Sequence, residues 1–215
     1  VSDTKLSRDP LGLISNQFVF CCFNNAYKIT PKVFSCWMRI LHKVKDSQLW
    51  LLTNNDETSE NLKMEAVNQG INANRLVFAR YESISEHLNR IKYADLFLDT
   101  RPYNAHTTSS DALRVGLPVL TCIGKSFPSR VAASILNSVN LPELITETEK
   151  EYESLAIELA TNPIKLKSIK NKLIDNLPTA PLFDTPLFTR KLESAYQTMY
   201  EKHHKGMKPE HIYVD

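Results

Sequence analysis

The chain of 215 residues predicts an α/β fold built on a doubly wound parallel sheet. Two observations carry this prediction. Short apolar segments suited to buried strands alternate five times with helical segments, and the connections between them are short. Strands joined through helices in this way lie parallel, with the helices on the faces of the sheet. We therefore expect a Rossmann-like sheet that binds its ligand at the carboxyl ends of the strands.

The first half of the chain carries three strand–helix pairs, marked by local signals. Residues 18–23 are apolar throughout, as in a strand that is buried on both faces. Thr30 and Pro31 follow as an N-cap and a first-turn proline, which predicts a helix from Pro31. Gly70 is a typical residue at a helix C-terminus. In chain order we expect strand 18–23, helix 31–44, strand 48–52, helix 59–68, strand 75–78 and helix 85–93.

The second half adds two strands and then becomes wholly helical from Thr148. We expect strand 96–99, helix 111–115, strand 118–121 and helix 129–137, then helices interrupted at Pro163 and over 178–181. The last helix, 186–203, is expected to pack outside the sheet or onto a neighbouring lobe. We divide the chain into an irregular segment (1–15), a Rossmann-like core (16–145) and a helical C-terminal extension of the same lobe (146–215).

Composition excludes several classes of partner. The net charge is only +2, and no basic stripe is interleaved with aromatic residues, so we expect no nucleic-acid partner. We also expect no membrane segment, because no stretch approaches the about 20 apolar residues that span a bilayer, and the N-terminus is no signal peptide. The chain begins at Val1 without an initiator Met, which we interpret as a piece of a longer protein.

The four cysteines show no metal-ligand spacing with histidine. Cys21 and Cys22 are adjacent in an expected strand, where neighbouring side chains point to opposite faces and do not easily bridge. With Cys36 and Cys122 they are expected to be free thiols, which favours a cytoplasmic protein.

A stretch of polar residues from Asp99 to Asp111 lies between the end of a strand and a helix. A helix N-terminus presents unpaired backbone N–H groups and the positive end of the helix dipole, which favours a phosphate there. Thr107 and Thr108 can add hydroxyl donors. Asp111, in the first turn of the expected helix, lies about one turn beyond them, within reach of a ribose hydroxyl. The alternative is that Thr107 only caps the helix, but the pattern His-Thr-Thr-x-x-Asp favours a nucleotide-diphosphate site.

These residues belong to a series of motifs that runs in order over nearly the whole chain. The motifs are Phe-Asn-Asn-x-Tyr-Lys-Ile-x-Pro (23–31), Ser-x-Leu-Trp-Leu-Leu (47–52), Glu-His-x-x-Arg (86–90), Asp-Thr (99–100), Asn-x-His-Thr-Thr-x-x-Asp (104–111), Gly-x-Pro-Val-Leu-Thr (116–121), Ser-Arg-Val-Ala-Ala-Ser (129–134) and Pro-Leu-Phe-Asp-Thr (181–185). Together they resemble the donor-binding lobe of the O-linked N-acetylglucosamine transferase family. The resemblance implies the C-terminal lobe of a GT-B type glycosyltransferase.

On the phosphate side, the resemblance implies two catalytic residues, Lys28 and His106, and further contacts to the donor. Lys28 contacts the diphosphate and steadies the departing nucleoside diphosphate, as a point charge in the crevice can. His106 makes a donor-side contact to phosphate or sugar and is not the base for the acceptor. Thr107 and Thr108 contact the phosphates. The family usually has Gln where this chain has Asn25, whose reach is one methylene shorter, so that donor contact is lost or bridged by water.

On the nucleoside side, His87 and Arg90 lie three residues apart and therefore on one face of a helix. The resemblance places His87 near the base or ribose and Arg90 on the base, with Asp111 on the ribose. It also implies that the backbone of the loop with Tyr81 and Glu82 reads the uracil edge. The family often has Lys in place of Ile84, and an Ile at this position removes a hydrogen-bond donor near the nucleotide.

The resemblance implies an inverting enzyme that transfers N-acetylglucosamine from UDP-GlcNAc to Ser or Thr hydroxyls of proteins, without a cofactor. Metal-dependent sugar transferases often carry an Asp-x-Asp pair, which this chain lacks, so Lys28, the helix N-terminus and the two Thr hydroxyls would offset the phosphate charge. The acceptor protein or peptide would bind through a second lobe, and in the family tetratricopeptide helices precede it; both would lie outside these 215 residues, which alone are expected to be inactive. The alternatives are a GDP-fucose-dependent protein O-fucosyltransferase lobe, a non-catalytic nucleotide-sugar binding module and a scaffold with an empty crevice.

Overall fold

The computed structural model describes residues 8–214, in which six parallel strands form one sheet. The strands are β1 (Phe18–Cys22), β2 (Ser47–Leu52), β3 (Leu76–Ala79), β4 (Leu96–Leu98), β5 (Val119–Cys122) and β6 (Ile145–Thr146). Their order in the sheet is β3-β2-β1-β4-β5-β6, so the direction of winding reverses between β1 and β4. Ligands of doubly wound sheets bind at the carboxyl ends of the strands beside such a reversal. The predicted fold class is confirmed.

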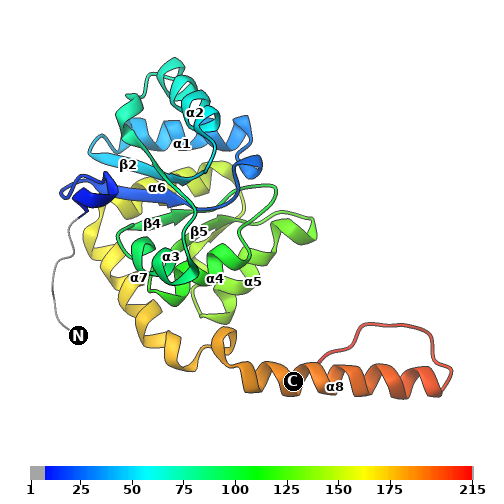
Figure 1. The fold of residues 1–215 in the computed structure, drawn as a ribbon. Coiled ribbons are helices and arrows are strands. Elements are labelled where there is room, and N and C mark those ends of the chain that lie inside the picture. Colours follow the sequence, from blue (N-terminus) through cyan, green and yellow to red (C-terminus); the bar gives the residue numbers. More distant parts are fainter. Residues whose placement is uncertain (1–7, 215) are drawn as a thin grey trace.

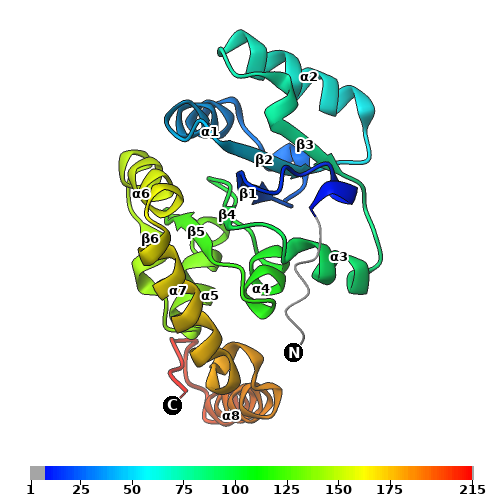
Figure 2. The same cartoon turned by 90° about the vertical axis from the view of Figure 1, so that its left-hand side faces the viewer.

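Helices cover both faces of this sheet (Figures 1 and 2). They are α1 (Pro31–Lys43), α2 (Asp56–Asn68), α3 (Ile84–Ile91), α4 (Thr107–Arg114), α5 (Val131–Ser138), α6 (Glu149–Thr161), α7 (Pro163–Asn176) and α8 (Thr185–His204). Helices α1 and α6 pack together, with the indole N–H of Trp37 donating to the hydroxyl of Tyr152 at 3.3 Å. Helices α3, α4 and α5 lie on the other side (Figure 2).

Local capping signals place two helix ends correctly. The Thr30 hydroxyl accepts the backbone N–H of Val33, so α1 begins at Pro31 as predicted. Helix α2 ends at Asn68, and Gly70 follows in the left-handed region at φ 77°. This helix starts at Asp56, three residues before the predicted start, because the side chain of Asn55 caps it by accepting the N–H of Thr58.

Helix α4 and strand β6 also differ from the prediction. Helix α4 starts at Thr107 and not at residue 111, because His106 takes the N-cap position; Asp111 therefore lies in the second helical turn, not the first. Thr107 is the first helical residue, so the alternative in which it caps the helix is wrong. Strand β6 was not predicted, because two residues carry no readable periodicity. It extends the sheet by one residue beyond the expected core boundary at 145.

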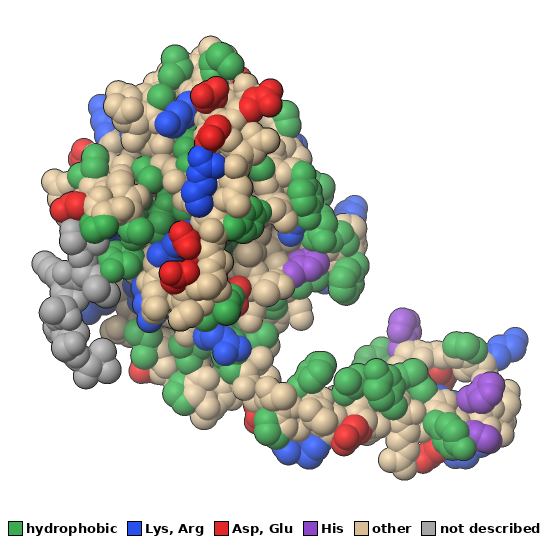
Figure 3. Space-filling model, viewed as in Figure 1, with side chains coloured by type: hydrophobic (Ala, Val, Ile, Leu, Met, Phe, Trp, Pro, Cys, Tyr) green, Lys and Arg blue, Asp and Glu red, His purple; other side chains and the backbone are tan. Residues whose placement is uncertain are grey.

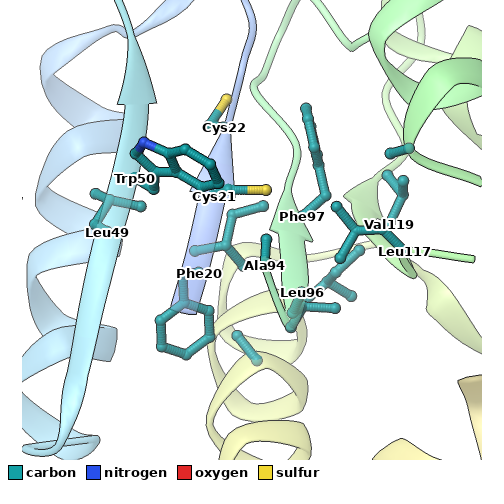
Figure 4. Close-up of a cluster of buried hydrophobic side chains, with 14 of the residues drawn as sticks. Phe20, Cys21, Cys22, Leu49, Trp50, Ala94, Leu96, Phe97, Leu117 and Val119 are labelled. Atoms are coloured by element: carbon teal, nitrogen blue, oxygen red, sulfur yellow. The ribbon is translucent and has the colours of Figure 1, made fainter. Parts of the chain in front are cut away.

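The sheet forms the centre of the hydrophobic core (Figure 4). Phe20, Leu49, Trp50 and Phe97 are at most 1% exposed, as strands covered on both faces require. All four cysteines are buried and free, which confirms the expected thiol state. Burial raises the pKa of Cys21 and of Cys22, so both remain thiols at neutral pH.

Helix α8 projects away from the sheet domain (Figures 1 and 2) and buries none of its residues. Its exposed apolar side chains include Phe188, Tyr196 and Tyr200, and hydrophobic side chains gather along it in Figure 3. The terminal helix lies outside the sheet as predicted, and its packing onto a neighbouring lobe stays a prediction. Of the predicted irregular segment, residues 1–7 lie outside the described residues, and Asp9–Leu11 form a short 3-10 helix.

Candidate functional site

A cavity of about 470 Å³ opens at the carboxyl ends of β1, β3 and β4, beside the reversal in strand order. Segments after three strands and the starts of α3 and α4 form its walls. All ten residues predicted to contact the donor line it, namely Asn25, Lys28, Tyr81, Glu82, His87, Arg90, His106, Thr107, Thr108 and Asp111. The sequence motifs therefore converge on one place in the fold.

The ammonium group of Lys28 is held against the loop that follows β4. Its Nζ donates to the backbone oxygen of Asn104 at 2.9 Å and lies 3.8 Å from the ring centroid of Tyr103. Burial lowers the pKa of Lys28, and the nearby carboxylate of Asp99 opposes that shift. A cation that is already half-buried and oriented suits an anionic ligand at the cavity wall.

The first turn of α4 leaves backbone donors free at the same wall. His106 is the N-cap, but its side chain caps nothing, and the N–H groups of Thr107, Thr108 and Ser109 have no hydrogen bond within residues 8–214. The exposed hydroxyl of Thr107 is also without a hydrogen bond in this part of the chain. Free amides and a positive dipole end make this helix start suitable for a phosphate.

Thr108 differs from its expected role as a hydroxyl donor to the ligand. Its hydroxyl donates to the side-chain oxygen of Asn24 at 2.5 Å, so that proton is already used inside the protein. Of the two predicted hydroxyl donors, only Thr107 is free. The Asn24 side chain was not predicted to matter, although it lies two residues after the end of β1, within a quoted motif.

The ring of His106 lies among aromatic residues. It contacts Tyr103 and Phe127 at centroid distances of 5.2 and 6.4 Å, and its Nε2 is 3.5 Å from the backbone oxygen of Pro128. Within residues 8–214 no carboxylate contacts the ring, so the ring is not part of a His–carboxylate pair of the kind that raises the basicity of a catalytic histidine. This arrangement fits the predicted donor-side role better than that of a base.

On the opposite wall, His87 and Arg90 share one face of α3 and pack against Phe23. The His87 ring meets the Phe23 ring edge-on at 5.4 Å, and the Arg90 guanidinium lies 5.6 Å from the same ring. Burial and the charge of Arg90 lower the pKa of His87, which favours the neutral imidazole. The buried Arg90 Nε has no hydrogen-bond partner among the described residues.

The loop after β3 brings Tyr81 and Glu82 to this wall. The Tyr81 hydroxyl donates to the side-chain oxygen of Asn25 at 2.5 Å, and its backbone N–H donates to Asn54. The short Asn25 side chain is therefore engaged with Tyr81. Ile84, the position that departs from the family pattern, is 63% exposed at the cavity.

Asp111 lies between the two walls. Burial raises the pKa of its carboxyl, while the nearby charges of His87 and Arg114 lower it. The carboxylate has no hydrogen bond within residues 8–214, so its lone pairs are free for a ligand. A half-buried acceptor without a partner can accept hydrogen bonds from two adjacent hydroxyl groups.

Comparison with known proteins shows the family of this chain. Residues 4–192 match the profile of glycosyl transferase family 41. The chain belongs to this family.

Two named relatives show what the chain resembles. It is 35% identical over 213 residues to a probable UDP-N-acetylglucosamine–peptide N-acetylglucosaminyltransferase of Arabidopsis thaliana, covering 99% of this chain and 22% of that protein. The identity is also 35% over 206 residues to the corresponding enzyme of Caenorhabditis elegans, covering 96% of this chain and 18% of that protein. The chain thus spans about a fifth of the length of these relatives.

The solved structures support the same assignment. A mutant O-GlcNAc transferase of Thermobaculum terrenum superimposes with a TM-score of 0.82 at 31% identity, over 86% of this chain and 36% of that one. A putative UDP-N-acetylglucosamine 2-epimerase of Listeria monocytogenes matches with a TM-score of 0.53 at 12% identity, over 100% of this chain and 52% of that one, which shows the fold alone. The predicted family and the GT-B type fold are confirmed.

Residues 8–214 contain neither a group of side chains suited to a metal ion nor a helix that could span a membrane. No three His, Cys, Asp or Glu side chains among residues 8–214 are grouped so that they could hold a metal ion. In the same part of the chain, every helix is too short or too polar to cross a bilayer.

Proposed function

We propose that this member of family 41 binds UDP-GlcNAc and forms the donor lobe of an inverting enzyme that glycosylates Ser or Thr hydroxyls of proteins. The observation that carries the proposal is the convergence of all ten predicted donor residues on one cavity. The relatives from Arabidopsis and Caenorhabditis are both named as UDP-N-acetylglucosamine–peptide transferases, which favours this donor over GDP-fucose. The acceptor protein would reach the site through a second lobe supplied by the longer protein.

Each wall of the cavity would take one part of the donor. Lys28, Thr107 and the free amides at the start of α4 would bind the diphosphate, with His106 at the phosphate or sugar. Asp111 would accept the ribose hydroxyls. His87 and Arg90 would pack against the nucleoside, with Arg90 hydrogen-bonding the base.

Charge compensation supports a metal-independent donor site. A nucleoside diphosphate brings two or more negative charges, which Lys28 and the helix dipole would meet directly. As the diphosphate departs from the sugar, the same groups would stabilise the growing negative charge. We also propose a cytoplasmic location, supported by four buried free thiols.

Calorimetric titration of the 215-residue chain with UDP, UDP-GlcNAc and GDP tests the proposal. We expect UDP and UDP-GlcNAc to bind and GDP to bind at least tenfold more weakly. Preference for GDP would instead support the fucosyltransferase alternative. Binding of UDP-GlcNAc without transfer by the full-length protein would support a nucleotide-sugar binding module. If no nucleotide binds, the proposed function is wrong.

A further inference from the structure

The buried carboxylate of Asp99 lies behind the phosphate side of the cavity without lining it. Asp99 is 3% exposed and follows the last residue of β4. One carboxylate oxygen accepts the backbone N–H groups of Thr100 at 2.7 Å and Ala105 at 2.6 Å. The other accepts the hydroxyl of Thr121 on β5 at 2.6 Å. The side chain thus ties together both ends of the loop 100–105 and a neighbouring strand.

A chain of hydrogen bonds leads from this carboxylate to the cavity wall. The Asn24 amide donates to Asp99 at 3.3 Å and to the Thr100 hydroxyl at 2.7 Å, and its oxygen accepts from Thr108 in the first turn of α4. Ala105 directly precedes the N-cap residue of the same helix. The anchored loop also presents the Asn104 oxygen and the Tyr103 ring that hold Lys28. The position of Lys28 and that of the first turn of α4, the two features suited to a phosphate, therefore both depend on contacts that start at Asp99.

We propose that Asp99, in its ionised form, is the positioning residue for the phosphate side of the site. It fixes where the loop 100–105 and the first turn of α4 stand, and it touches no ligand itself. This inference rests on the proposed function, because it assumes that a diphosphate binds at that wall.

The charge state of Asp99 provides a direct test. Burial raises the pKa of the Asp99 carboxyl to about 7, although hydrogen bonds from Thr121, Ala105, Thr100 and Asn24 lower it. The ionisable groups that face it are Lys28 and Cys22, with Tyr152 on α6 donating to its backbone oxygen. Cys22 stays a neutral thiol, and burial raises the Tyr152 pKa, so neither of these groups ionises near neutrality. Protonation of Asp99 would weaken UDP binding as pH falls, whereas loss of the Lys28 proton would weaken it as pH rises, so the direction of the change distinguishes the two groups.

The experiment compares three variants of the 215-residue chain. Asp99→Ala removes the anchor, and Asp99→Asn keeps an oxygen for the two backbone N–H groups but places an amide where the second oxygen stood. Asp95→Ala is the matched control, because Asp95 stands at the amino end of the same strand, where it pairs with Arg8 and accepts the N–H of Val19. The affinities for UDP and for uridine are measured between pH 5.5 and 8.5.

We expect Asp99→Ala to weaken UDP binding at least tenfold at pH 8 and uridine binding less than twofold. Asp99→Asn should lose less affinity than Asp99→Ala but bind UDP more weakly than the wild type at pH 8, because its amide group cannot accept the Thr121 hydroxyl. Since the amide mimics the protonated carboxyl, its UDP affinity should converge with that of the wild type below pH 7. Asp95→Ala should keep the wild-type ratio of UDP to uridine affinity. Equal losses for UDP and uridine, or a ratio of wild type to Asp99→Asn that is constant with pH, would overturn the proposal.

Two further measurements cover other outcomes. If Asp99→Ala does not fold, Thr121→Val is measured instead. This variant removes one donor to the Asp99 carboxylate and should therefore raise the pH at which UDP affinity falls on acidification. An unchanged midpoint of that pH dependence would refute the role of Asp99. If the wild type binds no UDP, the proposed function fails. Hydrogen exchange measured without ligand then tests separately whether Asp99 anchors the loop 100–105. The Ala105 amide should then exchange at least tenfold faster in Asp99→Ala than in Asp95→Ala, and equal rates overturn the proposal.

Discussion

Replacing Lys28 by Met removes the ammonium group from the cavity wall and keeps the shape of the aliphatic stem. In the free protein this ammonium donates to the Asn104 oxygen at 2.9 Å and lies over the Tyr103 ring. A phosphate oxygen at similar distance would form a charge-assisted hydrogen bond, worth about 1.5–3 kcal/mol. We therefore expect UDP binding to weaken roughly 10- to 150-fold, since about 1.4 kcal/mol corresponds to a factor of ten.

Isothermal titration with UDP and with uridine separates the two parts of the ligand. Uridine has no phosphate, so its affinity should stay within about a factor of two of the wild-type value. Lys32→Met is the matched control, because it removes the same charge from a nearby side chain that is 79% exposed and does not line the cavity. Equal losses for UDP and uridine would show that Lys28 acts through folding. An equal effect of Lys32→Met would show that only the net charge matters.

The pH dependence gives a second test of Lys28. Burial lowers the pKa of this ammonium, so it loses its proton at lower pH than an exposed lysine would. Because the charged form is the one that binds phosphate, UDP affinity of the wild type should fall as pH rises through that lowered pKa. Lys28→Met should show no such fall. A decline of the same size in the variant would assign the titration to another group.

Three further predictions concern the ribose contact, the metal and the fold. Asp111→Asn should leave thermal stability nearly unchanged, because the helix-dipole effect of about 0.3–1 kcal/mol fades beyond the first turn and burial already disfavours the charge. The substitution should clearly weaken the binding of UDP and have a smaller effect on the binding of a 2′,3′-dideoxy analogue. The UDP affinity of the wild type should fall as pH drops through the raised Asp111 pKa. A variant that melts early but keeps its preference between the two ligands would show that Asp111 acts on stability alone. Calorimetry with a chelator should give the same UDP affinity as without it, whereas loss of binding that manganese restores would refute the metal-independent site. Gly70→Ala should lower the free energy of unfolding in urea by roughly 1–2 kcal/mol, because Gly70 has φ 77° and a Cβ would lie 3.3 Å from His42. The UDP affinity should stay constant. An unchanged unfolding midpoint would contradict this reasoning.

Local chemistry allowed much of the fold to be predicted from the sequence. A continuous apolar run such as 18–23 requires burial on both faces, and Thr30 acts on an amide only three residues away. Such signals depend on near neighbours, so the alternation of strands and helices could be read before any tertiary contact was known. The motifs also predicted the residues around the cavity, although their ligand contacts remain predictions.

Only the tertiary structure decided which polar groups of the site are already engaged. The hydroxyl of Thr108 meets Asn24, 84 residues away in sequence, and Lys28 meets the backbone of Asn104, 76 residues away. The anchoring role of Asp99 and the two-residue strand β6 depend in the same way on segments that are distant in the chain. Hydrogen bonds require partners within about 3 Å, and only the order and register of the folded strands set those distances.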